Sequence, residues 1–332
     1  MKEPLEYPGR RDVLRLLGAG AFGLALAPAA SSKPLRGIFV IAQTPFTESD
    51  KLDLDVLVNQ VKFVDRGRVH GFVWPQVASE WNTLTERERL DGAEAILAAG
   101  KKLRPAMVIG VQGPNAAAAV NYAKHAEKLG ADAIISLPPS ESGDPKAVLE
   151  YYKEVGKATE LPLFVQAVGN MTVESLLEMY KAIPTMRYIK YEARQPLPAI
   201  EQLRKGSGDQ IQVFTGNHGR TLIDEMWRGS AGTMPAASFG DLYTQVWDLW
   251  HEGKHKEAVE MWGRTDALIT ELGVYSGLDT LKYILYLRGV FKTYGIRKMA
   301  AGGGEGAGID ETGKQLLREM LGYLKPYLRA TT

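Results

Sequence analysis

Short apolar segments alternate with amphipathic segments along the chain from Leu35 onward. The apolar segments, such as GIFVIAQ from Gly37 and AMVIGV from Ala106, are rich in β-branched residues, which is typical of strands buried on both faces. The segments between them carry apolar residues at helical spacing, and helices are expected at 54–66, 86–100, 115–129 and 145–159. The expected strands begin at Gly37, Gly71, Ala106, Ala133, Pro162, Arg187, Ile211 and Gly232.

Eight strand–helix units in about 215 residues is the number that closes a (β/α)8 barrel, whose active site lies at the carboxyl ends of the strands. A doubly wound open sheet is the alternative, but no Gly-x-Gly-x-x-Gly motif follows the first strand, which argues against a dinucleotide-binding fold. After Asp241 the pattern is helical only, with helices expected at 243–251, 254–272, 278–294 and 311–328. We therefore predict an α/β fold: a (β/α)8 TIM barrel over residues 35–251, followed by a C-terminal helical extension over residues 252–332.

The residues before this pattern differ from the rest of the chain. Arg10 and Arg11 precede an apolar run from Leu14 to Ala27, which ends in small residues. A charged segment, a short apolar segment and a small-residue site are the parts of a secretory signal, and the paired arginines resemble the twin-arginine signal of bacteria. An amphipathic helix is the alternative, and the run is too short for a stable membrane span. We expect residues 1–31 to be a cleaved export signal and the protein to be periplasmic or secreted.

Charge and composition narrow the range of partners and cofactors. The net charge of +1 gives no electrostatic reason to expect binding to nucleic acid or to an anionic membrane. The absence of cysteine excludes disulfides, Cys-ligated metal and thiol catalysis. The five histidines show no metal-ligand spacing except His251 and His255, which are expected at the surface. No metal or other cofactor is therefore expected, and a metal-dependent lyase is the least favoured function.

The expected strand RYIKYE, from Arg187, carries a lysine and a glutamate on one face, because side chains alternate along a strand. If Lys190 faces the barrel axis, its stem is buried and its amine points to the C-terminal mouth, where active sites lie. Burial disfavours the charged form of an amine, and the neutral amine condenses with a carbonyl to form a Schiff base. The protonated imine then withdraws electrons from the adjacent carbon, which permits aldol cleavage, condensation or dehydration.

A structural role is the alternative for Lys190, which would then form an ion pair with Glu192 or extend to the rim. An ionised Glu192 close to the amine would favour the ammonium form and oppose nucleophilic attack. For catalysis Glu192 would have to be neutral, or engaged by another cation such as Arg194, His218 or Arg220. Alternatively, Glu192 is itself the general acid/base that the chemistry needs.

From Leu35 to about Arg297 the chain resembles the dihydrodipicolinate synthase / N-acetylneuraminate lyase family of class I aldolases. The resemblance rests on the order and spacing of GIFVIAQTPFTESDKLDLDVLVNQVKFV, ASEWNTLTERER, AAVNYAKHAEKLGADAIISLPP, LPLFVQAV and YIKYE. It implies a (β/α)8 barrel with a C-terminal helical extension, usually tetrameric. It also implies that Lys190 is the Schiff-base lysine of the sixth strand.

The chain departs from the family pattern at the residues that handle the substrate. The family's second-strand motif, commonly Gly-Thr-Thr-Gly-Glu, aligns with Gln76, Val77, Ala78, Ser79 and Glu80. In the family, the hydroxyls and backbone of this motif hold the carboxylate of a 2-oxo acid. Both threonines are replaced here and only the glutamate matches, so ordinary dihydrodipicolinate synthase activity is not expected.

The family's proton relay is replaced as well. Gln166 occupies the fifth-strand position of the tyrosine that relays protons to the imine, and glutamine cannot exchange a proton near neutral pH. The Pro-Pro-Tyr-Tyr segment after the fourth strand reads Pro-Pro-Ser-Glu here and ends at Glu141. Of the usual hydroxyl relay only Thr44, in TPF, remains.

The segment FTGNHGR after the seventh strand brings three further polar residues to the expected mouth. His218 suits either a proton carrier or a surface loop. Arg220 suits a substrate carboxylate, or pairing with Asp224 one turn along a helix. Asn217 completes the group.

We predict a Schiff-base lyase, either aldolase or dehydratase, that acts on a small 2-oxo acid or sugar-acid derivative. The alternative is a non-catalytic descendant that binds a small ligand in the barrel mouth, which the loss of the tyrosine favours. A homotetramer or dimer is expected, without nucleic acid or a stable membrane span. The expected catalytic residues are Lys190, Thr44, Glu192 and Gln166, and the expected substrate-binding residues are Val77, Ala78, Ser79, Glu80, Glu141, Asn217, His218 and Arg220.

Overall fold

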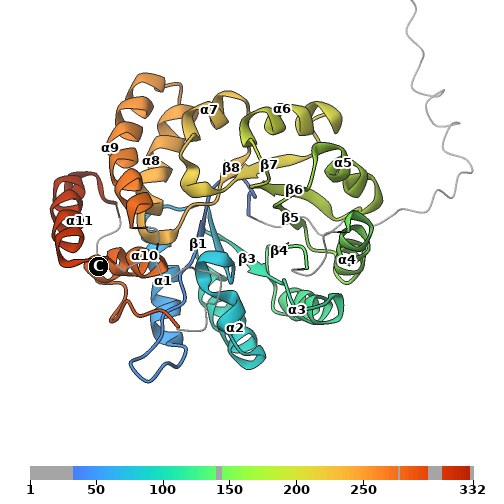
Figure 1. Ribbon diagram of the computed structural model, residues 1–332, viewed down its shortest axis with the longest axis horizontal. Helices are drawn as coiled ribbons and strands as arrows, with labels where there is room; N and C mark the ends of the chain where they lie inside the picture. Colours follow the sequence, from blue (N-terminus) through green and yellow to red (C-terminus); the bar gives the residue numbers. More distant parts are fainter. Residues whose placement is uncertain (1–32, 140–143, 276, 298–308, 330–332) are drawn as a thin grey trace, which may run out of the picture.

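The computed structural model describes residues 33–139, 144–275, 277–297 and 309–329. Within these residues, eight parallel strands pair in chain order and close into a barrel, with β1 pairing both β2 and β8 (Figure 1). The predicted (β/α)8 barrel is thereby confirmed, and the doubly wound sheet is excluded. The strands are β1 (Gly37–Ile41), β2 (Gly71–Trp74), β3 (Ala106–Gly110), β4 (Ala133–Ser136), β5 (Leu163–Ala167), β6 (Met186–Tyr191), β7 (Gln212–Thr215) and β8 (Gly232–Thr233).

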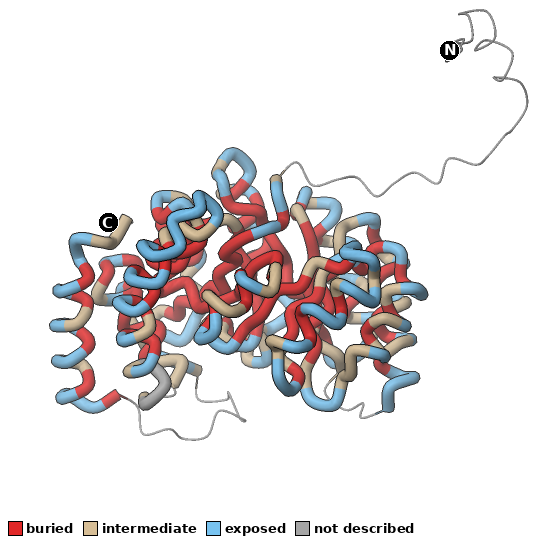
Figure 2. The backbone as a smooth tube through the Cα atoms, turned by 90° about the horizontal axis from the view of Figure 1, so that it is seen from above, coloured by how far each residue is buried: buried red, intermediate tan, exposed pale blue. Residues whose placement is uncertain are grey.

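Helices connect the strands and form the outer layer of the barrel (Figure 1). They are α1 (Leu54–Arg66), α2 (Glu86–Gly100), α3 (Ala116–Lys128), α4 (Pro145–Lys157), α5 (Val173–Ala182), α6 (Pro196–Gly206), α7 (Leu222–Trp227) and α8 (Gly240–His251). Figure 2 shows the buried chain concentrated in the middle of the molecule and the exposed chain on its outer helices.

Side-chain caps fix where several of these helices begin. Asp53, Thr85, Asn115, Asp144 and Thr172 each accept a hydrogen bond from a backbone N–H in the first turn of the helix that follows. Such caps satisfy N–H groups that have no partner within the helix. The caps account for the start of α1 and α2 at the residues that the hydrophobic pattern predicts.

The barrel interior and its outer face form two separate apolar layers. Phe39, Phe164 and Phe214 fill the interior, and the Tyr188 ring stacks on Phe164 with ring centres 4.4 Å apart. Ile189 belongs instead to the layer between the strands and the helices. The alternation along β6 therefore places Tyr188 inside the barrel, and Lys190, two residues further, projects to the same side.

The C-terminal extension comprises α9 (His255–Val274), α10 (Leu278–Leu287) and α11 (Glu311–Leu324). The helix expected over 278–294 ends earlier, at Leu287, because Gly289 adopts a left-handed φ of 68° and turns the chain away. Two buried hydrogen bonds of 2.8 and 2.7 Å join the Arg288 guanidinium to Asp241 at the start of α8. Within the described part of the chain, no helix combines the length and the apolar composition that crossing a bilayer requires.

Candidate active site at the barrel mouth

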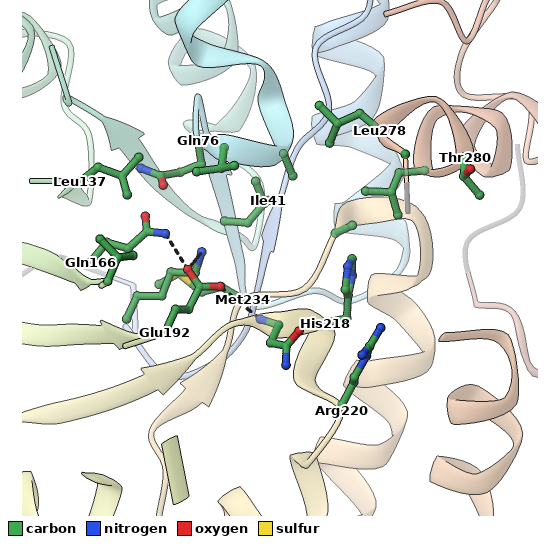
Figure 3. A pocket seen from close by; sticks show the side chains of 18 residues that line it. Ile41, Gln76, Leu137, Gln166, Glu192, His218, Arg220, Met234, Leu278 and Thr280 are labelled. Carbon is green, nitrogen blue, oxygen red and sulfur yellow. Dashed lines mark hydrogen bonds and ion pairs between the residues drawn. The ribbon is translucent and has the colours of Figure 1, made fainter. Parts of the chain in front are cut away.

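A cavity of about 450 Å³ lies at the carboxyl ends of the strands. Its walls come from strand ends, from the segment that follows β7 and from the start of α10 in the C-terminal extension. In Figure 3, Gln166 and Glu192 lie on one side of the cavity, and His218, Arg220 and α10 lie on the other. This is the end of a (β/α)8 barrel at which active sites are built.

Lys190 reaches this cavity from β6, above the aromatic interior of the barrel. The residue is only 5% exposed, and its neighbours in register are Gln166 on β5 and Phe214 on β7. Its amine lies 2.9 Å from the Glu192 carboxylate. The cavity therefore presents one buried primary amine, already paired with a group able to take its proton.

Three donors converge on the Glu192 carboxylate. Besides Lys190, the Gln166 side-chain amide donates at 2.6 Å and the Asn217 backbone N–H donates at 3.1 Å. Burial raises the pKa of Glu192, but the Lys190 charge and these hydrogen bonds together lower it below its ordinary value. Glu192 is therefore ionised at neutral pH, and Gln166 holds it in place.

Gly216 allows the segment after β7 to approach this carboxylate. A Cβ atom at position 216 would lie 1.8 Å from Oε1 of Glu192, which is well inside van der Waals contact. Any larger residue would displace either Glu192 or the backbone of Asn217 that binds it. The glycine thus has a specific steric role in the site.

His218 and Arg220 follow in the same segment and line the opposite wall. Burial, and then the nearby Arg220 charge, lower the pKa of His218, so its ring is neutral at pH 7 and can accept a proton. Asp224, the alternative partner considered for Arg220, is bound by Arg228 at 2.8 Å. In the described residues no ion pair holds the Arg220 guanidinium, which faces the cavity (Figure 3).

The segment after β2 contributes apolar groups. Val77 and Ala78 line the cavity from the 3₁₀ helix Val77–Ser79. Ser79 does not line it, since its hydroxyl donates to the Ala42 carbonyl at 2.5 Å. Thr44 is also directed elsewhere, because its hydroxyl donates to the Ser79 carbonyl at 2.5 Å and accepts from the Trp74 indole. Both hydroxyls therefore hold the backbone of this segment in place, and neither faces the cavity.

Glu80 lies outside the cavity as well. Its carboxylate forms a fully buried ion pair with Lys282 of α10 and accepts the Arg297 backbone N–H at 2.8 Å. Burial lowers the pKa of Lys282, and the Glu80 charge opposes that effect. This pair ties the segment after β2 to the C-terminal extension.

The cavity thus brings together eight of the expected site residues and leaves out Thr44, Ser79 and Glu80. Glu141 lies outside the described residues. The eight are Val77, Ala78, Gln166, Lys190, Glu192, Asn217, His218 and Arg220.

Sequence reasoning did not anticipate the wall that α10 contributes. Leu278, Thr280 and Leu281 line the cavity at the N-terminal end of that helix. They lie far along the chain from the strands, so no local pattern marks them. In the part of the chain that the structure describes, no three His, Asp or Glu side chains are arranged to hold a metal ion.

Comparison with known proteins shows to which family the chain belongs. The sequence profile described as the Dihydrodipicolinate synthetase family matches residues 34–301, most of the chain. The chain belongs to the dihydrodipicolinate synthetase family. This is a lyase family, and the match spans every strand of the barrel and α10.

Relatives within the dihydrodipicolinate synthetase family differ in their reactions. An L-2-keto-3-deoxyarabonate dehydratase from Azospirillum brasilense is 27% identical over 273 residues, covering 79% of this chain and 87% of that protein. A 4-hydroxy-tetrahydrodipicolinate synthase from Methanococcoides burtonii is 29% identical over 193 residues, covering 56% of this chain and 65% of that protein. At these identities the family is shared, and the substrate is not fixed.

The fold is shared with solved structures of the same family. A 4-hydroxy-tetrahydrodipicolinate synthase from Methylacidiphilum fumariolicum superposes with a TM-score of 0.79 at 19% identity, covering 89% of this chain and 97% of that chain. A prophage protein from E. coli K12, solved in complex with pyruvate, superposes with a TM-score of 0.78 at 18% identity, covering 88% and 99%. At such low identities the likeness concerns the fold alone.

Proposed function

We propose that this protein is a Schiff-base-forming lyase, an aldolase or dehydratase, that acts on a 2-oxo acid or a sugar-acid derivative. The observation that carries the proposal is the buried Lys190 amine inside the cavity, 2.9 Å from the ionised Glu192. The similarity to a 2-keto-3-deoxyarabonate dehydratase supports dehydration of a sugar-acid derivative as one form of the reaction.

Lys190 and Glu192 suit the first chemical step. Lys190 transfers one proton to Glu192, and the neutral amine adds to the carbonyl carbon of the substrate. The former carbonyl oxygen takes up one proton from the Lys190 nitrogen and the proton held by Glu192, and it leaves as water. This yields a protonated imine and returns Glu192 to its ionised form. The imine withdraws electrons from the adjacent carbon, so that a proton can be removed there by Glu192 or by neutral His218.

Gln166 has a supporting part in this scheme. The hydrogen bond donated by its amide N–H keeps Glu192 beside Lys190, but a glutamine amide exchanges no proton near neutral pH. The acid/base work therefore falls to Glu192 and His218. Arg220 is the group suited to a substrate carboxylate, because a guanidinium binds a carboxylate through two parallel hydrogen bonds.

Borohydride trapping tests the proposal. The mature protein is incubated with a panel of 2-oxo acids and 2-oxo-3-deoxy sugar acids, reduced with borohydride and weighed by intact mass. We expect a stable adduct with at least one panel member, located on the Lys190 peptide. Lys190→Arg should abolish the adduct, whereas Lys146→Arg, a change at an exposed lysine of α4, should preserve it. An adduct that survives Lys190→Arg contradicts the assignment.

One arrangement in the site favours the alternative of a non-catalytic ligand-binding protein. Lys190 is held in an ion pair by Glu192, and Gln166 stands where the family places a proton-relaying tyrosine. Calorimetric binding of a panel acid, combined with no trapped adduct for any member, would support this alternative over the lyase.

A further inference from the structure

A second carboxyl group is buried beneath the segment that completes the site. Glu225 belongs to α7, is 1% exposed and does not line the cavity. Its two oxygens accept from Thr215 at 2.5 Å and from Thr221 at 2.7 Å. No ion pair with a lysine, arginine or histidine of the described residues engages it. A buried carboxyl with hydroxyl partners alone is unusual, because buried charges are normally paired.

The groups around Glu225 come from three elements besides α7. Thr215 ends β7, and its hydroxyl also lies 2.9 Å from that of Thr233 on β8. Besides burial, the charge of Glu225 contributes to the raised pKa of Tyr243 on α8. On α7 itself, Asp224 is the charged neighbour of Glu225. None of these groups supplies a positive charge.

Thr215 connects Glu225 to the active site through two residues of backbone. Gly216 follows it and approaches Glu192, and the Asn217 N–H donates to the same carboxylate. At the other end of this segment, Thr221 binds the second oxygen of Glu225. Tyr243 donates to the His218 carbonyl at 2.5 Å and fixes the middle. The two residues that flank the segment 216–220, Thr215 and Thr221, are therefore hydrogen-bonded to the same carboxyl group.

We propose that Glu225 is a positioning residue whose protonation state sets the conformation of the segment 216–220, and through it the availability of the Lys190 amine beside Glu192. Burial raises the pKa of Glu225 to about 7, in spite of the two hydroxyl donors, so both protonation states are populated near neutrality. The importance of this coupling for turnover rests on the proposed Schiff-base function.

The two protonation states require opposite hydrogen-bond directions. When Glu225 is ionised, Thr215 and Thr221 both donate to it, and the Thr233 hydroxyl donates to the Thr215 carbonyl at 3.5 Å. When Glu225 is protonated, its own O–H must donate to one of the two threonines. If it donates to Thr215, the Thr215 proton turns to Thr233, and the attachment at β7 changes from charge-assisted to neutral and weaker. The proton stays on Glu225, and the weaker attachment at Thr215 allows the segment 216–220 to shift relative to Glu192.

Reductive methylation with formaldehyde and cyanoborohydride measures the reactivity of the Lys190 amine without any substrate. Methylation of the Lys190 peptide is followed by mass spectrometry from pH 5.5 to 8.5 and divided by that of exposed Lys146 in the same sample. We expect this ratio to show a step with a midpoint near pH 7. His218 titrates at lower pH, since its pKa is lowered, so it does not account for the step.

Variants show whether Glu225 causes this step in the methylation ratio. Glu225→Gln should remove it and hold the ratio at the low-pH level of the unchanged protein, because glutamine resembles the neutral acid. Asp224→Asn, on the same helix, should keep it. Thr221→Val removes one donor to the ionised form and should move the midpoint up by about one pH unit, which remains informative if the Gln variant does not fold.

The outcomes separate this inference from the proposed function. The absence of a step, a step that persists in Glu225→Gln, or an unmoved midpoint in Thr221→Val would overturn the role of Glu225. A lower melting temperature of Glu225→Gln with an unchanged pH profile would show a purely structural residue and would also overturn it. Failure of borohydride trapping with every oxo acid, in contrast, would count against the lyase and leave the methylation result intact.

Discussion

At the scale of single residues, Glu192 serves Lys190 in two opposite ways. As an ionised neighbour it stabilises the ammonium form, which is unreactive, and in the proposed mechanism it is also the base that removes the proton blocking attack. The hydrogen bonds from Gln166 and Asn217 spread the carboxylate charge over three donors. A substrate carbonyl that enters the cavity must therefore compete with an existing ion pair, which makes the contacts made by the rest of the substrate important.

Val77 and Ala78 bear on the contact expected for a substrate carboxylate. Neither side chain offers the hydroxyl that a threonine would place at the cavity wall. Each lost hydrogen bond to a charged group is worth about 1.5–3 kcal/mol, so the loss of two weakens pyruvate by about a hundredfold or more. We expect pyruvate to bind poorly in a calorimetric titration, and a longer acid that reaches Gln166 and Asn217 to bind better.

A double variant provides the control for this prediction. Val77→Thr with Ala78→Thr restores both hydroxyls at positions that already line the cavity. It should tighten pyruvate by at least about tenfold, the equivalent of 1.4 kcal/mol. Pyruvate binding by the unchanged protein as tight as that of the double variant would show that these two positions do not receive the carboxylate.

At the scale of elements, local signals in the sequence were sufficient for the barrel. Buried strands are continuous apolar runs, and capping residues such as Thr85 mark where helices begin. The direction of the Lys190 side chain on β6 could be predicted from the alternation of side chains along a strand. The direction of Glu80 did not, because its partner Lys282 belongs to a distant helix and a glutamate after a strand looks the same whether it faces substrate or core.

The Glu80–Lys282 pair should contribute strongly to stability. Lys282→Met would leave the Glu80 carboxylate buried without its cation, and removal of one partner of a buried pair costs about 3–5 kcal/mol. Urea unfolding of the variant should show a loss of this size. Adding Glu80→Gln should recover part of it, since the unpaired charge is then gone.

An exposed pair supplies the comparison for that measurement. Lys256 and Glu260 lie one turn apart on α9 with side chains 86% and 54% exposed, and such surface pairs contribute about 0–1 kcal/mol. Lys256→Met should therefore change the unfolding free energy little. Equal losses for Lys282→Met and Lys256→Met would contradict the special role of the buried pair.

At the scale of the whole molecule, the expected export signal remains a prediction, because residues 1–32 lie outside the described residues. Arg10 and Arg11 before the apolar run are its basis. Replacing both with lysine should keep the precursor in the cytoplasm, since the paired arginines mark the twin-arginine route. Cell fractionation with detection of the barrel measures this. Unchanged recovery of processed protein outside the cytoplasm would contradict that route.

The cavity wall supplied by α10 has a consequence for protein engineering. A gene shortened to end after His251 would encode all eight strands, but the product would lack Leu278, Thr280 and Leu281, and its cavity would be open on that side. Conversely, a library randomised at these three codons alone would reshape the wall facing the substrate and leave every strand that closes the barrel unchanged. We therefore expect the ligand preference of this cavity to be open to laboratory evolution from outside the barrel.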